Sequence, residues 1–117
     1  MGNSAFMLQA MAAKFITLAL YGALGTTAAG ATASTELTGG SPAYARKPLT
    51  WSTPTTAIPS VSSATAAVFD VGSGNTVQTF MTFDASTAGN FINSAAITSQ
   101  AFASQGTYSV TPTNNQS

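Results

Sequence analysis

The run Val68-Phe69-Asp70-Val71-Gly72-Ser73-Gly74-Asn75 leads directly into Thr76-Val77-Gln78-Thr79-Phe80-Met81-Thr82-Phe83. Both flanks are rich in Val, Phe and Thr, which favour strands, and the second flank alternates between two faces. Gly and Asn in the middle tolerate the positive φ angles that hairpin turns need. The pattern therefore predicts a β-hairpin with strands over 61–71 and 76–83 and a turn at 72–75.

Further short strand candidates lie on both sides of this hairpin, separated by turns rich in Gly, Pro and Asn. They cover 15–21, 36–38, 44–51, 91–92, 95–102 and 108–111. Pro48 makes 44–51 an edge or irregular strand, and the Gly/Ala/Thr-rich segment 22–34 is predicted to be a flexible loop. Six to eight short strands at this spacing favour a mainly β fold, an antiparallel β-sandwich or barrel-like domain.

The N-terminal segment predicts a short apolar helix from Asn3 to about Lys14, because Asn3 or Ser4 can cap it and good helix formers follow. Such a helix is apolar on nearly every side, so most of its surface has to be covered. We expect three parts: a helical arm for assembly contacts at 1–14, a single β domain at 15–111 and a polar C-terminal tail at 112–117.

Large apolar residues near the N-terminus are the candidates for contacts between subunits, because the helix carries more apolar surface than one docking face uses. The predicted assembly interface consists of Phe6, Met7, Met11, Leu20 and Leu24. The aromatic residues at strand positions are instead predicted to form the core. These core candidates are Trp51, Phe69, Phe80, Phe83, Phe91 and Phe102.

Charge is scarce in this chain of 117 residues: three basic and three acidic residues make up 5% of it, while the apolar fraction is 44%. A soluble domain usually has about 25% charged residues. Chains near zero net charge tend to associate, and disorder would require low hydrophobicity with high charge. The composition therefore indicates a folded subunit of an assembly, largely covered by its neighbours.

The chain contains no His and no Cys. It therefore has no thiol nucleophile, no His base, no disulfide and no zinc or haem site built on these residues. We expect no enzyme, no catalytic residue, no cofactor and no metal. The net charge is zero, so the chain lacks the cluster of basic residues that binds the phosphates of a nucleic acid. We therefore expect no nucleic-acid partner.

The few charged residues suit structural roles. Asp70 and Asp84 precede turns, where Asp usually hydrogen-bonds the local backbone. Arg46 and Lys47 could form a minimal anion patch. Two such charges are more often solvated, or paired with Glu36 in a neighbouring strand, and this second interpretation is favoured.

A secretory signal is an alternative interpretation of the N-terminus, with Lys14, an apolar run at 15–24 and a cleavage site after Ala33. Two features weaken it and also weaken a membrane span. The single positive charge follows thirteen mostly apolar residues, and Gly and Thr dilute the apolar run. We therefore expect no membrane partner.

The block Gly39-Gly40-Ser41-Pro42-Ala43-Tyr44-Ala45-Arg46-Lys47 is the most specific motif. With its flanks over 35–51, it resembles a family of small virion proteins of tailed phages that infect actinobacteria. These proteins are described as minor capsid (head decoration) proteins or tail fibre proteins. Weaker blocks at 16–18, 25–28, 69–77 and 100–108 follow in the same order. The sequence departs from the family's pattern at 19–25, where an apolar run replaces a polar one, and this fits burial against a partner.

The resemblance implies a structural role in a phage virion without catalysis. Our first hypothesis is a minor capsid protein that decorates the head and stabilises the lattice. Its partners would be itself, as a homo-oligomer such as a trimer, and the major capsid protein. A tail fibre or tail-tip subunit is the alternative, in which Tyr21, Tyr44 or Tyr108 could stack on host sugars. A secreted bacterial surface protein, cleaved after Ala33, is more distant.

Overall fold

The computed structural model describes residues 4–30 and 32–116. It confirms a mainly β fold with antiparallel sheets and one N-terminal helix. The elements are α1 (Ala5–Leu18), β1 (Tyr21–Gly25), β2 (Lys47–Pro48), β3 (Ser60–Ser63), β4 (Ala67–Val71), β5 (Thr76–Phe83), β6 (Phe91–Ala101), β7 (Gly106–Val110) and β8 (Thr113–Gln116). No helix in the described part of the chain is long and apolar enough to cross a membrane.

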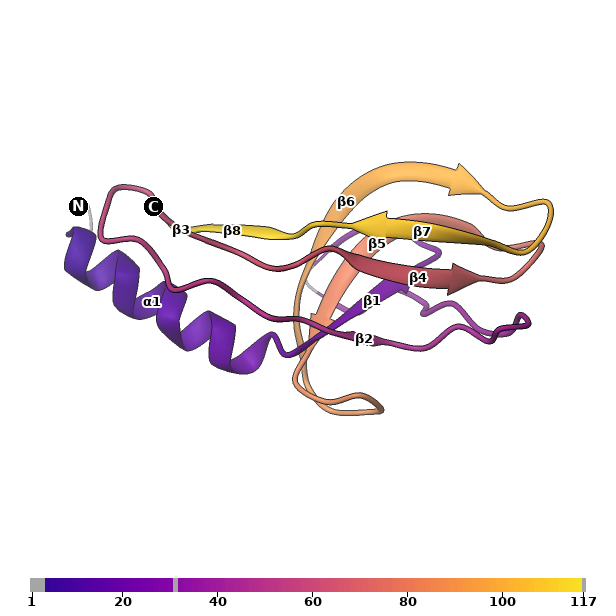
Figure 1. The fold of residues 1–117 in the computed structure, drawn as a ribbon, viewed down its shortest axis with the longest axis horizontal. Coiled ribbons are helices and arrows are strands. Elements are labelled where there is room, and N and C mark those ends of the chain that lie inside the picture. Colours follow the sequence, from indigo (N-terminus) through magenta and orange to yellow (C-terminus); the bar gives the residue numbers. More distant parts are fainter. Residues whose placement is uncertain (1–3, 31, 117) are drawn as a thin grey trace.

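The strands form one four-stranded sheet and two ribbons. The sheet has the order β2-β1-β5-β6, and the ribbons pair β4 with β7 and β3 with β8, all antiparallel. In Figure 1 the two ribbons follow each other along the long axis, because β3 leads into β4 and β7 leads into β8. The molecule is accordingly elongated, with extents of 47 × 23 × 22 Å.

The main core lies between the sheet and the β4–β7 ribbon. Its largest members are Leu24, Leu37, Leu49, Phe69, Val71, Val77, Phe80 and Phe102. Phe69 contacts Phe80 edge-on at 6.4 Å between ring centroids, a geometry that aromatic pairs prefer. The predicted aromatic core is confirmed: Trp51 packs against the main core while partly exposed, and the buried Phe83 and partly exposed Phe91 belong to a second cluster.

Helix α1 lies beside the β3–β8 ribbon and extends away from the four-stranded sheet (Figure 1). Ser4 caps it, since its Oγ accepts a hydrogen bond from the Met7 amide at 3.2 Å. Leu8 and Ala12 are fully buried, and Phe15 continues the same side one turn later. Spacings of four and seven residues keep these three side chains on one face of a helix, which is the face that packs.

The strand predicted over 15–21 is wrong, because α1 continues through Leu18 and only Tyr21 belongs to a strand. The ring of Phe15 packs edge-on against Trp51 at 5.4 Å, and this contact stabilises the last turns as helix. The flexible loop predicted over 22–34 is also partly wrong, since its first four residues complete β1. Within the predicted polar tail at 112–117, the residues Thr113–Gln116 form β8.

The predicted hairpin is wrong in its pairing, although β5 covers the predicted residues 76–83. β4 pairs with β7, while β5 pairs with β1 and β6. The turn at 72–75 therefore connects two layers rather than two neighbouring strands. Gly72 is held against another loop, because a Cβ added there would lie 2.9 Å from the Cα of Gly40.

Candidate assembly surface, polar network and cavity

The outer side of α1 is the largest concentration of exposed apolar side chains near the N-terminus. Phe6 is 77% exposed, Met7 49% and Met11 40%. Leu20 follows the helix and is 41% exposed. Four of the five predicted interface residues therefore lie on the surface, and their contact with a partner stays a prediction.

Leu24 is a correction to the predicted interface. It lies on β1 opposite Phe80 and is 0% exposed. Its amide donates a hydrogen bond of 3.0 Å to the Tyr44 hydroxyl. The sequence placed Leu24 in an apolar loop, but the loop is a central strand of the sheet, so this side chain belongs to the subunit's own core.

Glu36, Tyr44 and Arg46 form a partly buried polar network at the side of the sheet. The Tyr44 hydroxyl donates to Glu36 Oε2 at 2.7 Å. Arg46 donates to both Glu36 oxygens at 3.0 Å, and its Nη1 donates to the carbonyls of Ala85 and Ala88. Its guanidinium carbon lies 3.7 Å from the centre of the Phe83 ring. This confirms the favoured interpretation of Arg46 as a partner of Glu36.

Tyr44 is a structural residue rather than an exposed sugar-stacking one. Burial, followed by its hydrogen bond to Glu36, raises the pKa of Tyr44 above its ordinary value of 10.0. Its ring also stacks on Phe69 at 6.3 Å. Of the other two candidates, Tyr108 donates its hydroxyl to the Thr98 carbonyl at 2.6 Å, and Tyr21 is partly exposed at the start of β1.

The Gly-Gly-Ser-Pro part of the specific motif, residues 39–42, lies at the end of the molecule opposite α1 (Figure 1). There it contacts two other loops, through Gly72 and through Gln105. Gly40 has a φ of +102° and packs backbone to backbone against Gly72. Gln105 braces the same loop, because its amide accepts from the Ser41 amide and donates to the Pro42 carbonyl, both at 3.1 Å. The motif is thus explained by the fold.

Asp84 fulfils its predicted turn role. Its Oδ1 accepts from the Asn90 amide at 2.7 Å and its Oδ2 from the Asn90 side chain at 2.8 Å. These two hydrogen bonds, the backbone one first, hold the pKa of Asp84 below its ordinary 3.8. Asp70 lies on β4 opposite Thr107.

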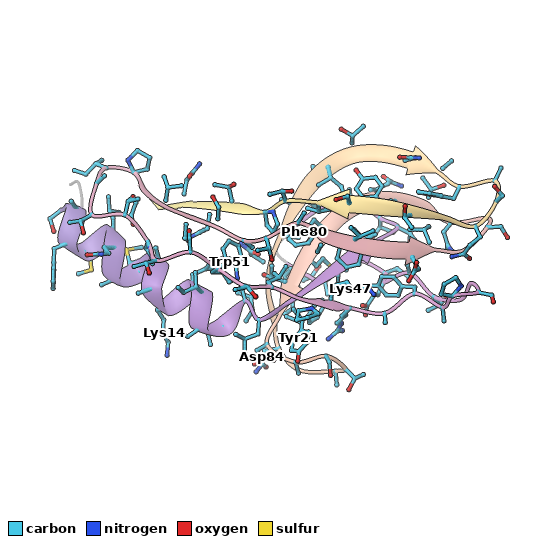
Figure 2. All side chains as sticks on the ribbon, in the orientation of Figure 1. Lys14, Tyr21, Lys47, Trp51, Phe80 and Asp84 are labelled. Carbon is cyan, nitrogen blue, oxygen red and sulfur yellow. The ribbon has the colours of Figure 1, made fainter. Side chains whose placement is uncertain are left out.

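A cavity of about 200 Å³ lies where α1 meets the sheet and the C-terminal strands. Figure 2 shows two of its residues, Trp51 and Phe80, near this junction. The lining consists of Phe15, Trp51, Phe80, Thr82, Asn93, Ala95, Ile97, Val110, Thr111, Pro112, Thr113 and Asn114. Sequence reasoning missed this site, because its residues come from five separate segments and share no motif. The predicted aromatic core was the sole signal.

These features define a class: a small, elongated β protein with an exposed apolar helix and hardly any charge. Residues 3–115 match the family described as Podophage GP4 fiber I protein gp80. The chain belongs to this family, so the resemblance to phage virion proteins is confirmed. No curated protein and no solved structure matches it.

Proposed function

We propose that this chain is a structural subunit of a tail fibre or tail tip, and that it assembles through the outer face of α1. The observation that carries the proposal is the family match over 3–115, whose description names a fibre protein. The proposal includes a role without catalysis, in which the partners are further copies of the chain.

The shape and the surface support this role. The subunit is about twice as long as it is wide, at 47 × 23 × 22 Å, which suits a building block of an extended assembly. Phe6 and Met7 lie on the arm made by α1 and the β3–β8 ribbon, outside the main core. Exposed apolar side chains gathered in one place mark interaction sites, so the arm is the proposed contact between copies.

The low charge supports the same role. The six charged residues include an internal pair, Arg46 with Glu36, and this leaves few groups that could repel a neighbouring copy. Association through such a surface depends weakly on salt, because screening acts on charges. We therefore expect oligomers of the isolated chain to persist at high ionic strength.

Head decoration, the first hypothesis from the sequence, has less support, because the family description names a fibre. The two locations differ in copy number. Quantitative peptide mass spectrometry on purified virions, scaled to the major capsid protein, should give few copies per particle, and antibodies should label the tail. A copy number close to that of the capsid protein, with label over the head, would overturn the fibre assignment in favour of decoration.

A further inference from the structure

We propose that the cavity between α1, β6 and β8 binds one ring of a neutral carbohydrate. Such a site would let the proposed fibre subunit bind a sugar, and this biological use of the site rests on the proposed fibre role. The binding itself is a property of the isolated chain. It can therefore fail or succeed independently of where the subunit lies on the particle.

Aromatic rings form one wall of the cavity. Trp51 and Phe15 meet edge-on with an interplanar angle of 76°, and Phe80 lines the same space. The Trp51 indole N–H donates to the Ala19 carbonyl at 2.8 Å, which fixes the ring in place. A fixed aromatic face of this kind suits the apolar C–H face of a sugar ring, because it offers contact area at little cost in side-chain entropy.

Polar groups lie on the other side, and one of them lacks a partner within the described residues. Asn114 lines the cavity, and its Nδ2 is buried without a hydrogen-bond acceptor. Directly across the ribbon, Ser62 is 1% exposed and its Oγ is likewise unpartnered. Buried donors without acceptors are rare and costly. The Asn114 Nδ2 has almost no exposed surface, so it reaches a ligand only when the amide turns toward the cavity that Asn114 lines, and Nδ2 gives up no hydrogen bond by turning.

A second amide lies at the exposed rim of the cavity. Asn93 lines it from β6, and its Oδ1 accepts a hydrogen bond of 2.6 Å from Thr82 Oγ1. The Thr82 contact orients the Asn93 amide. Amides and hydroxyls beside an aromatic wall give the mixture of a few placed polar groups and apolar surface that is typical of small-molecule sites.

The lining excludes charged ligands. It contains aromatic, aliphatic, Thr, Pro and Asn residues and no Lys, Arg, Asp or Glu. A carboxylate or ammonium group would lose its water without gaining a counter-ion, which is unfavourable. The volume of about 200 Å³ is below the range of about 300–1,000 Å³ usual for drug-sized ligands. These limits together indicate a single neutral ring that carries hydroxyl groups.

The test uses Trp51, the one tryptophan of the chain, whose emission reports directly on the cavity. Wild-type protein is titrated with glucose, galactose, mannose, rhamnose and N-acetylglucosamine, and with glucuronate as the charged comparison. At least one neutral sugar should change Trp51 emission saturably, and glucuronate should not. Asn114→Leu should weaken the binding about five- to tenfold, the effect of losing one hydrogen bond.

Asn115→Leu is the matched control, because Asn115 is the next residue on β8, is exposed and does not line the cavity. It should bind as wild type does. Absence of a saturable response to every neutral sugar, or equal binding by the Asn114→Leu variant, would overturn the proposal.

Discussion

Arg46 donates two parallel hydrogen bonds to Glu36, from Nε to Oε2 and from Nη2 to Oε1, each 3.0 Å long. The side chains are 9% and 28% exposed, respectively, so water covers little of the pair. Bidentate pairs of this kind are stronger and more directional than single charge contacts. Both residues lie in the connection between β1 and β2, so the pair holds two parts of this connection together.

We predict that Glu36→Gln lowers the free energy of unfolding by about 2 kcal/mol, the scale for hydrogen bonds to charged groups. The substitution keeps the shape but leaves the Arg46 guanidinium nearly buried without its counter-charge. Urea denaturation measures the effect. Lys14→Gln, which removes an exposed charge on α1, is the control and should change stability by less than about 0.5 kcal/mol. Equal stability of both variants would contradict a structural role for the pair.

Tyr44 should make the fold sensitive to alkali. Its folded-state pKa lies above the ordinary 10.0, so the stabilisation is fully present below that value and is lost as pH rises past it. In wild type, the phenolate absorbance of Tyr44 should develop together with unfolding. Tyr44→Phe should lack this component, and its stability should fall less on raising the pH from neutral. Ionisation of Tyr44 in a fully folded protein, seen by parallel circular dichroism, would refute this.

The contact between Gly40 and Gly72 predicts a large effect from a single methyl group. We expect Gly72→Ala to lower the free energy of unfolding by about 2 kcal/mol, the usual cost of forcing an atom into a packed site. Gly30→Ala is the matched control, because nothing lies within 4 Å of the position of its added Cβ. Thermal unfolding compares the two, and similar melting temperatures would show that the two loops separate readily.

The outer face of α1 is tested by Phe6→Asp combined with Met7→Asp. Both positions lie in the first turn after Ser4, where acidic residues favour a helix, so the fold should persist. We expect the oligomer of the isolated chain to dissociate and incorporation into virions to be lost, as measured by light scattering and by mass spectrometry of particles.

Val68→Asp is the control for this pair, because Val68 is also an exposed apolar residue, 51% exposed, but lies on β4 rather than α1. It should assemble as wild type does. Normal assembly of the double variant would show that the outer face of α1 is not the contact between copies.

Local sequence patterns predicted the fold class and β5 correctly. The alternation from Thr76 to Phe83 is a property of the segment itself, and so is the cap at Ser4. The edge position predicted from Pro48 also holds, because β2 lies at the edge of the sheet. Short apolar runs were ambiguous: Ile16 and Leu18 alternate as in a strand, but Phe15 extends the buried stripe that begins with Leu8 and Ala12.

Pairing and proximity could not be predicted in the same way. The turn at 72–75 has hairpin chemistry, yet the partner of β4 lies 35 or more residues later in β7. Leu24 looked like a loop residue because glycines surround it, and its burial depends on Phe80 across the sheet. The cavity assembles Phe15, Asn93 and Asn114 from distant segments. Each of these features depends on contacts that no local pattern encodes.

The alignment of the two ribbons with the long axis has a mechanical consequence. Tension applied between the α1 end and the loop end of the subunit runs parallel to β3, β4, β7 and β8 (Figure 1). Such a load acts in shear on the β3–β8 and β4–β7 strand pairs, whose paired residues run from Ser60–Gln116 to Val71–Gly106. Many interstrand hydrogen bonds then have to break together rather than one after another. A subunit built this way withstands pulling along its axis far better than peeling across it.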